Sequence, residues 1–82
     1  MYIVEFTDTA KKQFRKLEKE LQKRIISTLE RIRIRPEHFL VKLVGDPGYK
    51  LRVGNHRLIM DIDQGKLILL VLRMRYRRNV YD

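Results

Sequence analysis

Residues 48–60 read Gly-Tyr-Lys-Leu-Arg-Val-Gly-Asn-His-Arg-Leu-Ile-Met and carry the clearest fold signal in this 82-residue chain. Tyr49–Val53 alternates apolar and polar residues, and His56–Ile62 does so in its second half, as half-buried strands do. Gly54-Asn55 between them has the composition of a tight two-residue turn. The stretch therefore predicts a β-hairpin.

The two-residue turn also predicts which side chains of the hairpin lie opposite each other. Val53 should face His56, and Arg52 should face Arg57, while Lys50 points to the same side as Arg52. Two arginines directly opposed across a hairpin repel each other, and a bound polyanion would remove that repulsion. The alternative is that both side chains spread into solvent at little cost.

Turn signals on either side of the hairpin place further strands. Gly45-Asp46-Pro47-Gly48 is a strong turn signal before it, and Asp63-Gln64-Gly65 forms a turn after it. Leu67–Leu72 is apolar at every position, which predicts a central strand buried on both faces. Residues 2–6 have the composition of an N-terminal strand.

The turn at residues 63–65 decides where the later arginines point. A three-residue loop with Gly65 in the left-handed conformation puts Arg57 opposite Val71. The face of Arg52 and Arg57 would then also carry Arg73, Arg75 and Arg77. A two-residue loop would turn these three away, because a shift of one residue reverses the faces of a strand.

Apolar residues at helical spacing fill the region before Pro36; they are Ala10, Phe14, Leu17, Leu21, Ile25, Leu29 and Ile32. Thr7 or Asp8 supplies the N-cap. A single helix over residues 8–34 would be about 40 Å long, whereas a domain of this length is about 30 Å across. We therefore expect a break near Glu18–Glu20. The prediction is an α+β fold with an N-terminal strand and a two-helix hairpin packed on a small, mainly antiparallel twisted sheet, forming a single domain over residues 1–82.

The net charge of +9 comes from 19 Lys and Arg against 10 Asp and Glu. Up to Val41 there are ten basic and six acidic residues, and after it nine and four, so the whole body carries the excess. A strongly basic small domain favours nucleic acid as a partner, although a merely soluble basic surface is the alternative. Tyr76 and Tyr81, near Arg77-Arg78, offer rings that can stack on single-stranded bases.

Other chemistries have little support in the sequence. There is no cysteine, and His38 and His56 lack metal-ligand spacing, so we expect no metal and no cofactor. Asp61 and Asp63 are expected to flank a hairpin turn. No signal peptide or membrane-spanning run is visible, and we expect a soluble, cytoplasmic protein with no membrane partner.

In the hairpin and at the C-terminal end, the sequence resembles the RelE branch of the RelE/ParE toxin superfamily. Residues 48–60 are similar to the family's hairpin motif, and Arg77-Arg78-Asn79-Val80-Tyr81 is similar to its C-terminal signature. The chain has Arg75-Tyr76 where many relatives have Gly-His. The resemblance implies a RelE-like microbial RNase-type fold and a type II toxin that cleaves mRNA on the ribosome without a metal, by attack of the 2′-hydroxyl.

The resemblance also implies a role for individual residues and partners. Lys50 and Arg52 match the basic pair that activates the 2′-hydroxyl or neutralises charge, and Arg57 the arginine that stabilises the transition state. Arg77 matches the arginine at the leaving 5′-oxygen, and Tyr81 the tyrosine that orients the nucleotide. Substrate contacts are expected from Arg73, Arg75, Tyr76 and Arg78. A cognate acidic antitoxin is implied, in a heterodimer or heterotetramer.

Two other functions stay open at this point. One is a ParE-like toxin of the same fold that inhibits DNA gyrase. The other is a non-catalytic basic module that binds RNA or DNA, for which the basic surface alone suffices. The residue acting as general base, the codon preference and the register of the last strand are also left open.

Overall fold

A computed structural model of the chain describes residues 1–76, and the predicted hairpin forms its centre. Strands β3 (Tyr49–Val53) and β4 (His56–Asp63) pair with Arg52 opposite Arg57 and Val53 opposite His56, which confirms the predicted register. Gly54 in the turn has a φ of 59°. Only glycine adopts this left-handed conformation without a steric penalty.

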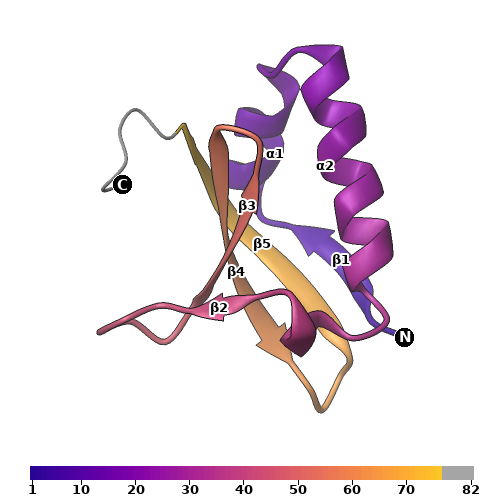
Figure 1. The fold of residues 1–82 in the computed structure, drawn as a ribbon, viewed down its shortest axis with the longest axis vertical. Coiled ribbons are helices and arrows are strands. Elements are labelled where there is room, and N and C mark those ends of the chain that lie inside the picture. Colours follow the sequence, from indigo (N-terminus) through magenta and orange to yellow (C-terminus); the bar gives the residue numbers. More distant parts are fainter. Residues whose placement is uncertain (77–82) are drawn as a thin grey trace.

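Five strands form one sheet in the order β1-β5-β4-β3-β2 (Figure 1). The first strand, β1 (Ile3–Phe6), runs parallel to β5 (Ile68–Tyr76), and the other neighbours are antiparallel. The mainly antiparallel sheet is therefore confirmed. The short edge strand β2 (Val41–Lys42) was not predicted, because two residues carry no recognisable pattern.

The helical region is broken as predicted, into α1 (Asp8–Arg15) and α2 (Lys19–Ile32). Thr7 is the N-cap of α1, and its hydroxyl accepts a hydrogen bond from the Ala10 amide at 3.1 Å. Near the end of α1, the Phe14 carbonyl accepts hydrogen bonds from the Leu17 amide at 3.1 Å and from the side-chain amide of Gln22 at 2.8 Å. The longest dimension of the molecule is 33 Å, too short for one straight helix over this region. A short 3₁₀ helix, η1 (Pro36–His38), follows α2.

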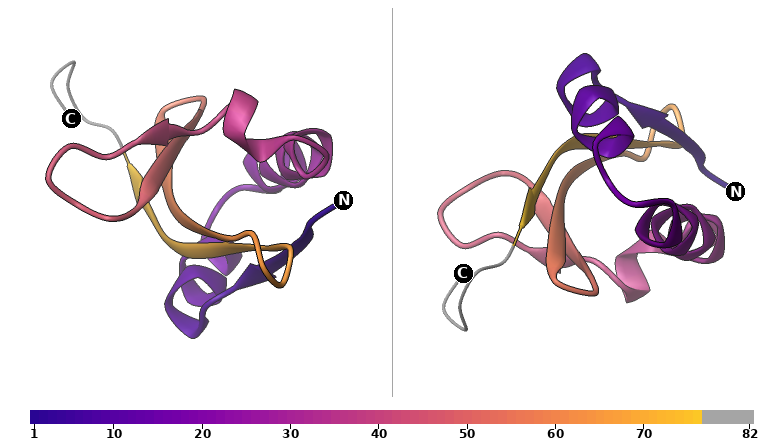
Figure 2. Two further views of the ribbon diagram at one scale, coloured as in Figure 1. Left: turned by 90° about the horizontal axis from the view of Figure 1, so that it is seen from below. Right: turned by 90° about the horizontal axis from the view of Figure 1, so that it is seen from above.

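Both helices pack into one hydrophobic core on one side of the sheet, and the twisted sheet curves around α2 (Figure 2). The helices contribute Ala10, Ile25, Leu29 and Ile32, and the sheet contributes Leu51, Val53, Leu58, Met60, Leu69, Val71 and Met74. Burying one large aliphatic side chain stabilises a fold by about 1.5–3 kcal/mol. The sheet residues between these core positions point to the opposite face.

The register between β4 and β5 differs from the prediction. Asp63 pairs with Ile68, so the turn spans residues 64–67, and Leu67, with a φ of 56°, takes the left-handed conformation expected of Gly65. Arg57 lies opposite Arg75 and not opposite Val71. The strand begins at Ile68, and its second face is only half buried rather than fully buried.

A β-bulge at Leu72 nevertheless places the arginines on the predicted face. Ile59 pairs with Arg73 but Met60 pairs with Val71, so Leu72 is an extra residue without a partner on β4. Without the bulge, the turn would pair Arg57 with Met74, and the arginines of β5 would face the core. One inserted residue reverses the alternation and returns them to the opposite side.

Candidate functional site

Five cations gather on the face of the sheet opposite the core, and we call them the basic face: Lys50, Arg52, Arg57, Arg73 and Arg75. They form two rows across β3, β4 and β5. One row is Arg52–Arg57–Arg75, and the other is Lys50–Ile59–Arg73. Neighbouring strands are about 4.8 Å apart and alternate residues about 7 Å apart. The Cα atoms of the five cations therefore lie within an area of about 10 Å by 7 Å.

Ile59 lies at the centre of the basic face and is only 4% exposed, although it belongs to the side of the sheet away from the core. Lys50 and Arg73 flank it directly, and the aliphatic stems of such side chains cover apolar surface while their charged ends reach water. A Cβ atom added to Gly48 would lie 3.8 Å from a methyl group of Ile59, so the backbone at Gly48 also packs close to this side chain. The cations thus stand around an apolar floor.

The same face is acidic at its other end. The next row along the strands is Asp61–Leu70–Glu5, about 13 Å from the arginine row. Asp61 accepts a hydrogen bond from the Ile62 amide, and Asp63 accepts one from the Lys66 amide, each at 2.9 Å. These two aspartates flank the turn as expected. In residues 1–76 no group of three or more His, Cys, Asp or Glu is arranged to hold a metal ion.

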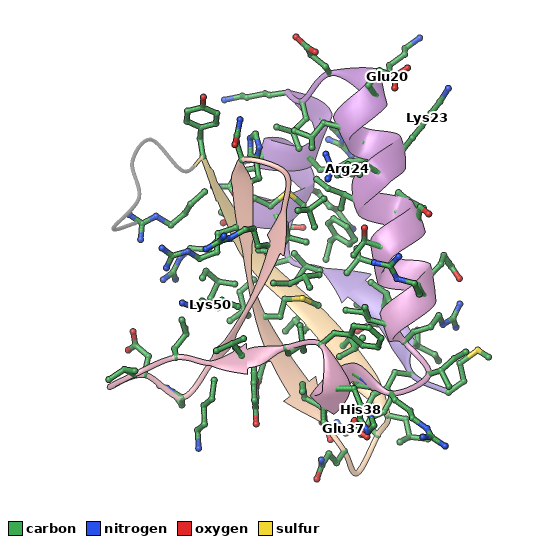
Figure 3. All side chains as sticks on the ribbon, viewed as in Figure 1. Glu20, Lys23, Arg24, Glu37, His38 and Lys50 are labelled. Carbon is green, nitrogen blue, oxygen red and sulfur yellow. The ribbon has the colours of Figure 1, made fainter. Side chains whose placement is uncertain are left out.

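Three of the five cations have no polar partner in the described part of the chain. Within residues 1–76, the side chains of Lys50, Arg52 and Arg73 make no hydrogen bond or ion pair. Lys50 projects from β3 on the side away from α2 (Figure 3). Like charges side by side on neighbouring strands destabilise a sheet, so the arrangement favours an anionic ligand that supplies the missing counter-charge.

Tyr76 lies apart from the basic face. It pairs with His56, and the two rings make an edge-to-face contact with centroids 5.3 Å apart. Both belong to the side of the sheet that carries Leu58 and Met74, so the structure does not bring Tyr76 together with Arg73 and Arg75. Burial lowers the pKa of His56 below the usual 6.5. Three further predicted site residues, Arg77, Arg78 and Tyr81, lie outside the described residues.

One cation near the site was not predicted. Arg24 projects from α2 toward the β3–β4 turn (Figure 3). Its Nη1 lies 3.3 Å from the position that a Cβ on Gly54 would occupy. The helical pattern of the sequence shows only that Arg24 is off the apolar stripe. Its contact with a turn thirty residues later depends on how the helix crosses the sheet.

A second surface is an apolar groove between β1, α1 and α2. Its volume is about 600 Å³, and it is lined by Val4, Glu5, Phe6, Lys11, Phe14, Arg15 and Ile26. An adjoining hollow of about 430 Å³ shares Phe14 and Ile26 and adds Gln22, Lys23 and Ser27. We call this continuous surface the helical groove. It combines an apolar base with basic side chains at its rim.

Residues 4–81 match the family described as the ParE toxin of the type II toxin–antitoxin system parDE. This chain belongs to the RelE/ParE toxin superfamily. It is therefore a toxin of a type II toxin–antitoxin system by family. No curated protein gives a significant sequence match.

Solved structures of this superfamily share the fold. The RelE–RelB complex of the archaeon Pyrococcus horikoshii OT3 gives a TM-score of 0.81 at 22% identity, covering 96% of this chain and 98% of the other. The intact E. coli RelBE complex gives 0.80 at 24% identity, covering 98% and 100%. The RelBE2 complex of Mycobacterium tuberculosis gives 0.79 at 26% identity, covering 93% and 98%. The predicted RelE-like fold is thus confirmed. None of the helices in residues 1–76 is long and apolar enough to cross a membrane.

Proposed function

We propose that this single-domain toxin is a metal-independent, ribosome-dependent endoribonuclease that cleaves mRNA. The observation that carries the proposal is the basic face, where five cations from three adjacent strands surround a buried isoleucine. Such a cluster supplies what phosphodiester cleavage by an internal hydroxyl needs most, which is positive charge at fixed positions around one phosphate.

The proposed reaction needs no external nucleophile. The 2′-oxygen attacks the adjacent phosphorus and forms a new P–O bond, while the bond from phosphorus to the 5′-oxygen breaks. The proton leaves the 2′-hydroxyl for a base, and the 5′-oxygen takes up a proton. The products are a 2′,3′-cyclic phosphate and a 5′-hydroxyl. Because nucleophile and phosphate belong to the same nucleotide, the protein mainly supplies in-line orientation and charge stabilisation.

Within this mechanism Arg57 has the central position, because it has a basic-face cation on each side along its row. We assign it to the non-bridging oxygens of the pentacoordinate phosphate, where charge accumulates in the transition state. Lys50 and Arg52 on β3 act on the side of the attacking 2′-oxygen. The apolar floor at Ile59 keeps water from beneath the cations, and charge interactions strengthen where water is excluded.

The remaining predicted residues have supporting roles in the proposal. Arg73 and Arg75 contact neighbouring phosphates from β5. Arg77 acts at the leaving 5′-oxygen, Arg78 contacts the substrate and Tyr81 stacks on the scissile nucleotide, as the family resemblance implies. Tyr76 has a weaker case, because its ring lies against His56 on the other side of the sheet.

The charge of the helical hairpin supports the part of the proposal that places cleavage on the ribosome. Residues 11–24 contain seven Lys and Arg against two Glu, and all of these charged residues are exposed. A basic helical surface contacts RNA backbone without regard to sequence, and this gives affinity that falls with salt. The basic face and the helical hairpin can thus divide the work between cleavage and docking.

The partner that neutralises the toxin is proposed to be an acidic antitoxin. Solved relatives include the P. horikoshii RelE–RelB complex, and the E. coli and M. tuberculosis structures are described as toxin–antitoxin complexes. An amphipathic segment of such a peptide could place apolar side chains over Phe14 and Ile26, and carboxylates beside Lys11 and Arg15. We expect a heterodimer or heterotetramer.

Primer extension on an mRNA, with and without purified ribosomes, tests the proposal. Cleavage is expected only with ribosomes, with 2′,3′-cyclic phosphate and 5′-hydroxyl ends, and it should continue at EDTA concentrations that leave the ribosome intact. Products with 5′-phosphate ends would contradict the mechanism. A parallel supercoiling assay addresses inhibition of DNA gyrase, the activity to expect of a ParE-like toxin, since the matching family is described as ParE. Inhibition of gyrase without mRNA cleavage would favour that function.

A further inference from the structure

One edge of β5 pairs with β4, and the other, outer edge pairs with β1 only as far as the bulge. β1 ends at Phe6, opposite Val71, so that β5 continues for five more residues past the end of its parallel partner. The helix α1 lies along this part of the strand instead. The bulge and both β5 arginines of the basic face fall in the segment beside α1.

Thr7 binds two successive carbonyls of β5. Its amide donates to the Val71 carbonyl at 3.0 Å, and its hydroxyl donates to the Leu72 carbonyl at 2.6 Å. In a regular strand successive carbonyls point to opposite edges, so one residue could not bind both. The bulge turns the Leu72 carbonyl to the outer edge, and Thr7 satisfies it there.

Gln13 provides a second contact to the same edge. Its side-chain oxygen accepts a hydrogen bond from the Met74 amide at 2.6 Å. Met74 is buried and lies between Arg73 and Arg75, so this bond fixes the backbone of the residue that separates the two arginines. Thr7 and Gln13 therefore hold the strand on both sides of Arg73.

We infer that Thr7 and Gln13 are positioning residues that hold the Leu72 bulge and thereby keep Arg73 and Arg75 on the basic face. The reason is the alternation of the strand: the arginines reach this face only because one residue is inserted, and a bulge leaves backbone groups that need partners. The catalytic consequence rests on the proposed function, but the structural role does not.

Gln13 offers the cleaner test of the two. Thr7 is also the N-cap of α1, so its replacement would weaken the helix as well. Gln13→Ala removes the acceptor for the Met74 amide, whereas Gln13→Glu keeps an oxygen at the same distance along the side chain. The matched control is Gln22→Ala, because Gln22 also binds a distant backbone group, the Phe14 carbonyl, but does not touch β5.

The first readout is amide hydrogen exchange of the purified full chain. In Gln13→Ala we expect exchange at Met74 to accelerate about tenfold, the factor for loss of one ordinary hydrogen bond. Exchange at Leu58, in the opposite strand, should change no more than in Gln22→Ala. Gln13→Glu should restore slow exchange. Unchanged exchange at Met74 in Gln13→Ala would overturn the inference, as would an equal acceleration in Gln22→Ala.

The second readout separates this inference from the proposed function. In single-turnover cleavage on saturating ribosomes, Gln13→Ala should lower the rate about tenfold with unchanged ribosome affinity, and Gln13→Glu should recover most of it. A rate equal to that of Gln22→Ala would show that the contact between Gln13 and Met74 does not matter for cleavage and would overturn that part of the inference. If the unmodified toxin cleaves nothing, the proposed function fails, and the exchange of Met74 still decides the structural role. Should Gln13→Ala not fold, the same comparison is made between Gln13→Glu and the unmodified chain, in which exchange at Met74 must stay slow.

Discussion

Arg52 of β3 lies directly opposite Arg57 of β4. The row continues into β5 with Arg75, so three guanidinium groups occupy neighbouring positions on adjacent strands. Like charges at directly opposed positions destabilise a sheet, and a bound anion offsets that cost.

Replacing one member of the arginine row should stabilise the free protein. Arg52→Gln keeps an unbranched polar side chain at this position but removes a charge from the row. We expect the free energy of unfolding to rise by up to about 0.5 kcal/mol at low salt and the gain to vanish near 1 M salt, where charges are screened. Urea unfolding at the two salt concentrations measures this. Lys66→Gln removes an exposed charge at a turn and should give no comparable gain.

Cleavage should depend on Arg57 more than binding does. Arg57→Ala removes the central cation of the row, and the single-turnover cleavage rate should fall by ~10²-fold or more. Ribosome affinity should hardly change, because many Lys and Arg residues share it. Arg31→Ala, on the exposed side of α2, is the control and should leave the rate unaltered. Full activity in Arg57→Ala would leave the basic face as a binding surface only.

Two of the turn glycines, Gly54 and Gly65, should respond differently to alanine. Gly54 has a φ of 59° and lies against the Arg24 guanidinium, so Gly54→Ala should destabilise the protein by ~1–2 kcal/mol. Gly65 lacks a positive φ, and an added Cβ would meet its nearest neighbour, the Asp63 carboxylate, at an ordinary 3.5 Å. Gly65→Ala should therefore be neutral. Thermal unfolding of the two variants side by side checks both expectations.

Stability should decline on mild acidification because of His56. Its pKa is lowered in the folded state, so the unfolded chain takes up a proton first as the pH falls below about 6.5. Above that pH His56 is neutral in both states and does not change the free energy of unfolding. Between pH 6.5 and the lower pKa of the folded state, the free energy of unfolding falls as the pH falls. Urea unfolding from pH 7.5 to 5 should show a smaller decline in His56→Gln than in the unmodified chain. His38→Gln, at an exposed position in η1, should keep the full decline.

A charge in the helical groove should disturb antitoxin binding without changing the cleavage rate on saturating ribosomes. Ile26 lines both hollows of the groove and is 43% exposed, so Ile26→Asp should fold. The added carboxylate would remove apolar contact and repel an acidic peptide. We expect at least ~10-fold weaker binding in a titration with the cognate antitoxin, while the single-turnover cleavage rate on saturating ribosomes stays unchanged. Ile34→Asp, 60% exposed and outside the groove, should bind the antitoxin normally.

The sequence could predict the β3–β4 hairpin because everything that fixes it is local. Gly54-Asn55 sets the turn, and the turn sets the pairing of Arg52 with Arg57. The β4–β5 register could not be predicted in the same way. It depends on a left-handed Leu67 and on a bulge at Leu72, whose partners Thr7 and Gln13 lie about sixty residues earlier in the chain.

The candidate site was partly predicted for the same reason. Lys50, Arg52 and Arg57 follow from the hairpin, whereas the placement of Arg73 and Arg75 on that face was right although the register behind it was wrong. Tyr76 was grouped with the basic residues because its ring lies among them in the sequence, but alternation places it on the other side of the sheet. Neither the buried Ile59 nor the position of Arg24 had a signal in the sequence.

The face of the sheet opposite the core carries positive charge at one end and negative charge at the other. With Arg57 at one end of β4 and Asp61 at the other, the face has an electric dipole along the strand direction. An approaching polyanion is then not only attracted but also rotated, since its charge is drawn to one end and pushed from the other. A larger fraction of encounters would then occur in the binding orientation, and this effect would decrease as added salt screens the charges.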